Sequence, residues 1–424
     1  MQTLQMFNLI LTVVFSLCCA YQLVYLLLPL VKKEKPLPPS RGEHDYAVLI
    51  CARNEEKVVG GLLSSLRAQT YPAEKLHIFV LADNCTDGTE AAARAGGARV
   101  YVRRDETRIG KGYALEALLE HLHRDCPEGF DGYFVFDADN LLEPDYIEQM
   151  DRSFSSGLEI VTGYRNSVNH DAGWISAGSA LWFLRESRYL NHARHLLGVS
   201  CAVSGTGFLF SRAVAEELGT WPFHLLTEDI EFTAYQLLRG RRIGFCAGAV
   251  FYDEQPESFA QSWRQRLRWA RGYVQVMLRY GPGLARGALR GSFACYDMLM
   301  NILPFILLPA FSLGSALALG VWSAVHGASL LPCLGGVART LGGSWLLFFL
   351  LGAYTTATEW EQIHACTLRK LAYLFTFPLF LMTYLPVGVA SLFYDPGWKP
   401  IYHKGLARRE PEGRRRGRVV SAGQ

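Results

Sequence analysis

The sequence predicts an α/β domain with a parallel sheet, inserted between apolar segments long enough to span a membrane. Between about residues 45 and 249, short strand-like runs alternate with helical ones, as in sheets covered by helices on both faces. Long apolar runs flank this region on both sides. Half of the 424 residues are hydrophobic and 19% are charged, against roughly 25% in typical soluble domains. This composition argues against a wholly soluble, disordered or collagen-like protein.

The first segment is an uncharged run at residues 6–31. It is long enough to cross a hydrocarbon core of about 30 Å. A secretory leader would begin with basic residues, but here the first ones, Lys32, Lys33 and Lys35, follow the run. We therefore expect residues 1–35 to be a retained anchor, with the chain from Lys32 onward in the cytosol.

The α/β region follows a proline-rich spacer. We expect strands at 46–51, 76–82, 98–102, 133–136 and 159–162, and helices at 56–69, 86–95, 111–123 and 144–156. Because open α/β sheets bind ligands at the carboxyl ends of their strands, the residues that follow each strand are the candidate site.

Polar residues follow three of these strands. The first ends in Ala52-Arg53-Asn54-Glu55, the second in Asp83 and the fourth in Asp137-Ala138-Asp139. Carboxylates this close repel each other unless a cation or hydrogen-bond donors lie between them. The pair favours a metal site, although polar strand ends that only cap the next helix remain an alternative.

Two later segments carry further candidates. Thr227-Glu228-Asp229 opens a predicted helix, where Thr227 would be the cap and the acids would suit the helix dipole without any chemistry. Gln265, Arg268 and Trp269 share one face of a second helix, combining a phosphate-binding fork with a flat plate for a sugar. The other basic residues of that helix are expected on a solvated face at the membrane surface: Arg264, Arg266 and Arg271.

Other motifs are incomplete. Gly110-Lys111-Gly112 lacks the glycine and the hydroxyl residue of a phosphate-binding loop, since Asp105 and Gly112 occupy those places. Gly205-Thr206-Gly207 lacks the third glycine of a dinucleotide fingerprint. The net charge of +3 is too small to indicate nucleic-acid binding.

Taken together, the motifs resemble those of the membrane-embedded processive glycosyltransferases of family 2. That group includes the cellulose, hyaluronan, chitin and poly-N-acetylglucosamine synthases. The resemblance covers about residues 43 to 280 closely and the apolar segments more loosely. The motifs that carry it are LADNCTDGT with Asp83, FDADN with Asp137 and Asp139, SGTGFLF at 204–210, TED at 227–229 and QRLRW at 265–269.

The resemblance implies a GT-A, Rossmann-like fold for residues 43–255. Residues 256–292 would form interface helices, residues 293–394 membrane and interface helices, and residues 395–424 a basic cytosolic tail. It further implies an integral membrane protein with a cytosolic catalytic domain. This domain would transfer sugar, with inversion, from a nucleotide sugar (a UDP-sugar by resemblance) to a saccharide acceptor.

It also implies residue roles. Asp229 would be the general base, and Asp139 with Asp137 would hold the diphosphate through Mg²⁺ or Mn²⁺. The remaining donor and acceptor residues implied are Ala52, Glu55, Asp83, Lys111, Gln265, Arg268 and Trp269. The expected product is a growing β-linked polysaccharide exported through the membrane helices. The alternatives are single or few transfers to a lipid or oligosaccharide, and an inactive membrane scaffold.

The C-terminal part is apolar again, with candidate spans at 295–322, 341–358 and 371–393 and an amphipathic interface helix at 359–370. Three full crossings would leave the arginine-rich tail outside, so we expect one run not to cross. The last, with Pro378 and Pro386, is the candidate for a break. Trp398 and His403 follow it, either in an interfacial anchor or in a lid over the nucleotide.

Overall fold

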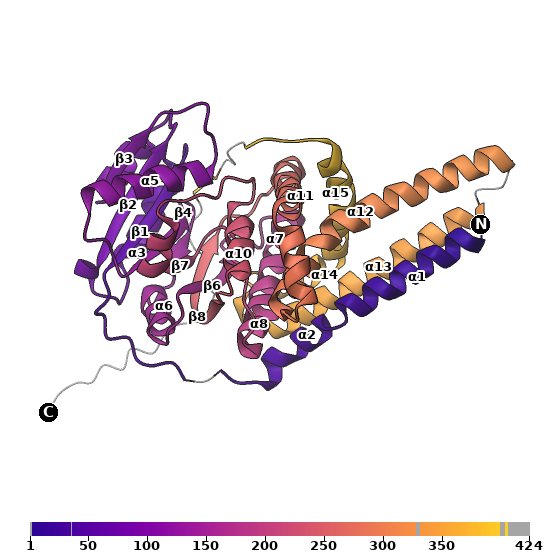
Figure 1. Cartoon of the computed structure of the whole chain (residues 1–424), viewed down its shortest axis with the longest axis horizontal. Coiled ribbons are helices and arrows are strands. Elements are labelled where there is room, and N and C mark those ends of the chain that lie inside the picture. Colours follow the sequence, from indigo (N-terminus) through magenta and orange to yellow (C-terminus); the bar gives the residue numbers. More distant parts are fainter. Residues whose placement is uncertain (1, 35, 328–330, 399–402, 406–424) are drawn as a thin grey trace.

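The computed structural model describes residues 2–34, 36–327, 331–398 and 403–405 (Figure 1). A sheet with flanking helices forms one end, and the long helices α1, α12 and α13 run away from it at the other end (Figure 1). The arginine-rich tail, predicted to be cytosolic, and residues 399–402 of the predicted lid or anchor segment lie outside the described residues.

The described sheet has eight strands in the order β3-β2-β1-β4-β7-β6-β8-β5. Strands β3, β2, β1 and β4 are parallel to one another, but β7 is antiparallel to both β4 and β6. The expectation of a purely parallel sheet is therefore wrong for the second half. The strand bounds are β1 Tyr46–Ala52, β2 Leu76–Asp83, β3 Arg99–Arg103, β4 Gly132–Asp137, β5 Leu141–Leu142, β6 Ile160–Ser167, β7 Phe208–Ser211 and β8 Ile243–Asp253.

Helices cover both faces of the sheet, because successive side chains of a strand point to opposite sides. Ala47 and Leu49 of β1 face a core shared with α5, α7 and α9, whereas Val48 and Ile50 face a second core with α3 and α6. The helices on the two faces are α3 Val59–Arg67, α4 Thr89–Ala95, α5 Lys111–Asp125, α6 Tyr146–Ser155, α7 Trp174–Arg185 and α9 Arg212–Leu218.

The chain then connects to the membrane-directed helices. A π-helical turn, Glu186–Asn191, continues α7 into α8 His192–Leu197, and α10 Glu228–Leu238 packs against the long α11 Phe259–Leu289. The apolar helices are α1 Gln2–Cys19, α2 Gln22–Val31, α12 Phe293–His326, α13 Leu331–Thr358, α14 Thr367–Met382 and α15 Tyr384–Phe393.

Three stretches of the described chain are long and apolar enough to cross a membrane: Val13–Val31, Ala338–Thr358 and Thr367–Phe393. The last is broken at Thr383, between α14 and α15, as its prolines led us to expect. The predicted span at 295–322 falls within the longer helix α12. The predicted run at 6–31 is divided into two helices, α1 and α2.

Two expectations about the membrane-side residues are wrong. Residues 359–370 do not form one interface helix; Trp360–Gln362 is a short 3-10 turn, and α14 begins at Thr367. The buried Glu359 accepts a hydrogen bond from Tyr164 of β6, which ties this segment to the sheet. Arg266 is not solvated: it is 1% exposed, because α14 and α15 cover its side of α11.

A buried ion pair joins the sheet domain to the membrane-directed helices. Arg194 of α8 lies 2.6 Å from Asp297 of α12, and both side chains are almost fully buried. The hydroxyl of Tyr21, beside α2, donates to the same carboxylate at 2.6 Å. Breaking such a pair leaves an uncompensated buried charge, so the three elements are held in one arrangement.

Candidate active site

A cavity of about 670 Å³ lies at the carboxyl ends of β1, β2, β4 and β8 and continues to α12 and α13. Every site residue expected from the sequence lines it. These are Ala52, Glu55, Asp83, Lys111, Asp137, Asp139, Asp229, Gln265, Arg268, Trp269, Trp398 and His403.

Asp139 is the most strongly perturbed carboxylate at the sheet end of the cavity. Burial raises its pKa to about 7; Asp253, Asp137 and Glu55 add to the rise, while the imidazole of His403 opposes it. A buried carboxylate among other carboxylates is stabilised as an anion by a cation, so the donor set fits Mg²⁺ or Mn²⁺.

The protein supplies few ligands for such a cation. Within the described ranges, no three His, Cys, Asp or Glu side chains cluster at metal-binding spacing. Mg²⁺ commonly takes one or two carboxylates and completes its shell with substrate phosphates and water. The expected metal site is therefore compatible with the geometry only as a site shared with a phosphate-bearing donor.

The other carboxylate of the motif is engaged by a lysine. Lys111, the first residue of α5, contacts Asp137 and donates to the carbonyl oxygen of Gly205 at 2.7 Å. Gly112 allows this placement, because a Cβ there would lie 1.9 Å from the carbonyl oxygen of Phe223. In this arrangement Asp137 and Lys111 form an ion pair beside Asp139 at the wall of the cavity.

The predicted nucleoside residues lie at the ends of β1 and β2. Asp83 is buried, and its carboxylate accepts from Arg103 at 2.6 Å. Burial raises the pKa of Asp83, and Arg103 opposes that rise. Arg103 therefore holds the Asp83 carboxylate at the wall of the cavity, which Ala52 also lines.

Two adjacent carboxylates lie at the start of α10. Burial raises the pKa of Asp229 to about 6 and that of Glu228 to about 7, although Lys111 and Arg268 lower both. A carboxylate with a pKa in this range is suited to accept a proton near neutral pH. The predicted cap is wrong: Thr227 makes no capping hydrogen bond, and its buried hydroxyl has no partner.

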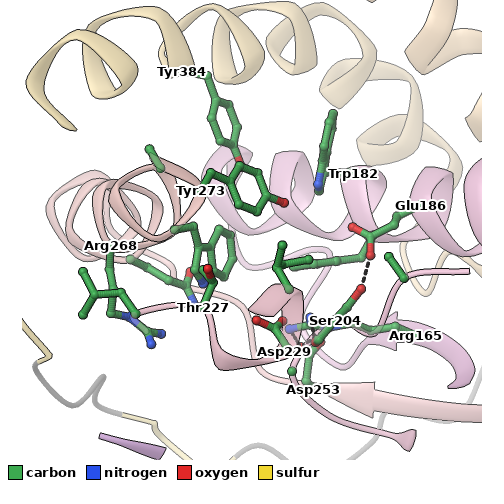
Figure 2. Close-up of a pocket in the computed structure, with 18 of the residues that line it drawn as sticks. Arg165, Trp182, Glu186, Ser204, Thr227, Asp229, Asp253, Arg268, Tyr273 and Tyr384 are labelled. Carbon is green, nitrogen blue, oxygen red and sulfur yellow. Dashed lines mark hydrogen bonds and ion pairs between the residues drawn. The ribbon is translucent and has the colours of Figure 1, made fainter. Parts of the chain in front are cut away.

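The QRLRW helix, α11, presents Gln265, Arg268 and Trp269 to the cavity. The indole of Trp269 meets the Phe183 ring edge-on, with centroids 6.0 Å apart. Figure 2 shows Tyr273 and Tyr384 facing each other above this region, with Trp182 beside them. The cavity next to the carboxylates is therefore lined by aromatic rings suited to a sugar.

The segment after α15 returns to the sheet end of the cavity. The guanidinium of Arg53 lies 5.2 Å from the centre of the Trp398 ring. His403 contacts Glu55 at 3.0 Å, and its Nε2 lies 3.7 Å from the Asp139 carboxylate. These carboxylates raise the pKa of His403 to about 10 despite its burial. The predicted lid residues therefore lie across the candidate donor site.

Sequence reasoning missed several polar residues of the cavity. Arg165 of β6 forms an ion pair with Asp253 of β8, and Glu186 accepts from the hydroxyl of Ser204 (Figure 2). Asp253 stands at the end of a strand that was not predicted, so the rule on strand ends could not point to it. The sequence shows Glu228 as an acid beside Asp229 at the start of a helix, where an acid can simply interact with the helix dipole. Only its burial in the structure marks it as a residue of the cavity.

Comparison with known proteins identifies the family to which the chain belongs. The sequence model described as "Glycosyltransferase like family 2" matches residues 44–272. The chain is 26% identical over 236 residues to poly-beta-1,6-N-acetyl-D-glucosamine synthase of Staphylococcus aureus (strain COL), covering 54% of this chain and 55% of that protein. It is 25% identical over 240 residues to beta-monoglucosyldiacylglycerol synthase of Synechocystis sp., covering 55% and 48%. The matches thus span about half the length of these curated relatives.

A solved structure resembles nearly the whole chain. The mannosyltransferase PcManGT from Pyrobaculum calidifontis, in complex with GDP-Man and Mn²⁺, has a TM-score of 0.55 and 20% identity. The likeness covers 89% of this chain and 96% of that one. At this identity it shows the fold alone, and the GT-A fold expected from the sequence is confirmed.

Proposed function

Because the chain belongs to glycosyltransferase family 2 and is a glycosyltransferase, we propose that it transfers sugar from a UDP-sugar to an acceptor arriving from the membrane side. The observation that carries the proposal is the cavity, which joins the candidate donor carboxylates to α12 and α13. One continuous space can hold the donor at the sheet and the acceptor at the helices.

The proposed reaction is a single displacement. The acceptor hydroxyl forms a bond to the anomeric carbon while the bond to the diphosphate oxygen breaks, so the centre is inverted. Asp229 accepts the proton of that hydroxyl, which its raised pKa favours. Negative charge develops on the leaving diphosphate, where Lys111 and Arg268 stabilise it.

The proposed reaction also uses a divalent metal ion. A Mg²⁺ or Mn²⁺ ion held by Asp139 would supply further charge neutralisation at the diphosphate. Asp83 would bind the base, and Trp398 and His403 would close over the donor. Trp269 would stack on the acceptor sugar. Each of these roles is an expectation from the resemblance that the arrangement supports.

Two acceptor classes fit the cavity. The aromatic lining and the resemblance to polysaccharide synthases support a growing β-linked polysaccharide, exported through the membrane helices. The far end, however, is lined mainly by apolar residues, which supports the alternative of one or few transfers to a lipid. The apolar residues in question are Met300, Pro304, Leu341, Phe348 and Leu351. We propose the lipid acceptor first and the exported polymer second.

The proposed location is an integral membrane protein with its sugar-transfer domain in the cytosol. Three candidate spans and the lysines after α2 support it. This side of the membrane is also where nucleotide sugars are available.

Purified protein tests the proposal. The protein in detergent, with membrane lipid extract, is incubated with radiolabelled UDP-sugars, with Mg²⁺, with Mn²⁺ or with a chelator. We expect metal-dependent UDP release and label that partitions into butanol as a glycolipid. Label that elutes as a large water-soluble polymer would support the second candidate. No turnover with any UDP-sugar would contradict the proposed donor.

A further inference from the structure

Arg185, at the junction between the sheet domain and the membrane-directed helices, forms no ion pair with the residues that the structure describes. It ends α7 and lines the cavity together with Gln22, Asn301 and Thr340. Its Nε is buried and has no hydrogen-bond partner in the described part of the chain. The guanidinium lies over the ring of Trp182, 5.0 Å from its centre.

No ion pair links Arg185 to a carboxylate within the described residues, although the nearby charge of Glu186 favours its protonated form. Glu186, its neighbour in sequence, points to the hydroxyl of Ser204 instead (Figure 2). Three neighbouring arginines each have a carboxylate partner: Arg194 has Asp297, Arg188 has Glu359 and Arg165 has Asp253.

Burial lowers the pKa of Arg185 to about 10; the carboxylate of Glu186 opposes this, the charge of Arg194 adds to it, and the side chain stays protonated at neutral pH. Arg185 is only partly buried, but its Nε is shielded from solvent, and donors in such places are normally paired or hydrogen-bonded. A guanidinium offers several donors in a plane, which matches the oxygens of a phosphate. The missing partner is therefore an anion supplied by a ligand of the cavity.

The two ends of the cavity define that ligand further. Beyond Arg185 the wall is mainly apolar, with Met300 and Pro304 of α12 and Phe348 of α13, although Asn301 and Thr340 also line it. Toward the sheet, Glu186 and Ser204 lead to Gly205, where an added Cβ would lie 3.5 Å from the Asp229 carboxylate. An anion at Arg185 would thus stand between the candidate base and an apolar passage.

We propose that Arg185 binds the phosphate group of a lipid acceptor whose hydrocarbon tail lies along α12 and α13. The inference deepens the proposed function and rests on its first acceptor class. It separates phosphate-bearing lipids from neutral lipids and from a free polysaccharide, which offers no anion to Arg185.

Fluorescence quenching tests the site without turnover, because Trp182 lies beside Arg185. The detergent-solubilised protein is titrated with dioleoyl phosphatidic acid brominated in its tails, with equally brominated dioleoylglycerol, and with inorganic phosphate. The Trp182→Phe variant identifies the share of quenching that belongs to this indole. We expect phosphatidic acid to quench it and dioleoylglycerol to do so far less.

The variants give the sharper comparison. Arg185→Gln should weaken phosphatidic acid binding roughly tenfold or more, the effect of one charge-assisted hydrogen bond. Arg185→Lys should retain most of it, and Arg264→Gln, which removes an exposed arginine of α11, should leave it unchanged.

Three outcomes would overturn the proposal: equal quenching by dioleoylglycerol, unchanged binding in Arg185→Gln, or full competition by millimolar inorganic phosphate. The last would indicate a site for free phosphate rather than for a lipid. UDP release from the donor is measured in parallel, so normal turnover without lipid-phosphate binding would leave the proposed function intact.

Discussion

Replacing Asp229 with asparagine separates the proposed base from a structural role. The side chain keeps its shape but can no longer accept a proton. We expect turnover to fall by roughly 10²-fold or more, the usual contribution of a general base, while UDP binding is retained. In the unmodified protein, turnover should rise as the pH passes through about 6, where Asp229 loses its proton. Activity at pH 5 should then be about tenfold below its plateau.

The same substitution should stabilise the fold. Burial raises the pKa of Asp229 from 3.8 to about 6, which corresponds to at most about 3 kcal/mol. Because the folded-state pKa is the higher one, the stabilisation from the bound proton is complete below about pH 4 and lost as the pH rises through about 6. Above that pH the charged carboxylate destabilises the native state, and asparagine removes this cost.

Thermal unfolding and turnover are measured on the same detergent samples at pH 5 and pH 7.5. We expect Asp229→Asn to unfold a few degrees higher than the parent at pH 7.5, with a smaller difference at pH 5. Glu228→Gln is the matched control, since its carboxylate is also buried and its pKa is also raised, to about 7. The reasoning is refuted if Asp229→Asn keeps its activity, or if it loses activity together with stability and UDP binding. Loss of turnover only in Glu228→Gln would move the base to that residue.

Other substitutions test the remaining parts of the site. Asp139→Asn should abolish metal-dependent turnover and Mn²⁺ binding measured by electron paramagnetic resonance; full activity would contradict the metal assignment. Gly112→Ala should displace Lys111, because its Cβ would lie 1.9 Å from a backbone oxygen, and should lower stability by about 1–3 kcal/mol in a melting experiment; wild-type melting and turnover would refute the close approach. Trp398→Ala with His403→Ala should reduce turnover strongly without altering expression or membrane insertion, whereas normal turnover would favour the anchor interpretation.

The first half of the sheet and the cavity residues at its strand ends could be predicted because their signals are local. The ends of β1, β2 and β4 are marked by Glu55, Asp83 and Asp139, and parallel strands bring such ends to one edge. The positions of these motifs directly after predicted strands are therefore enough to predict that their side chains lie at one edge of the sheet. Helical spacing added Trp269 and the resemblance added Lys111, neither of which a strand-end rule would find.

The remaining features depend on tertiary packing, which a local pattern does not record. Strand β7 has only four residues and follows two glycines, so the sequence shows no period-two pattern there. Neither the strand nor its antiparallel direction could be predicted. Arg266 has the spacing of a solvated basic residue, yet another helix covers it. Thr227 has the residue type of a cap, but it packs against Gly272 of α11, where a Cβ would lie 2.5 Å away.

The burial of Arg266 also explains how the membrane-directed helices shape the acceptor end of the cavity. Its guanidinium donates to the carbonyl oxygen of Phe380 and to the hydroxyl of Thr383, at the break between α14 and α15. The Thr383 hydroxyl in turn donates to the Phe380 carbonyl oxygen at 2.6 Å, so the arginine and this turn form one hydrogen-bonded group at the break. Tyr384, the first residue after the break, lines the cavity and faces Tyr273 (Figure 2). The helix α11 thus contributes Gln265, Arg268 and Trp269 to the cavity and also contacts the turn that carries Tyr384, so it connects two walls of the cavity.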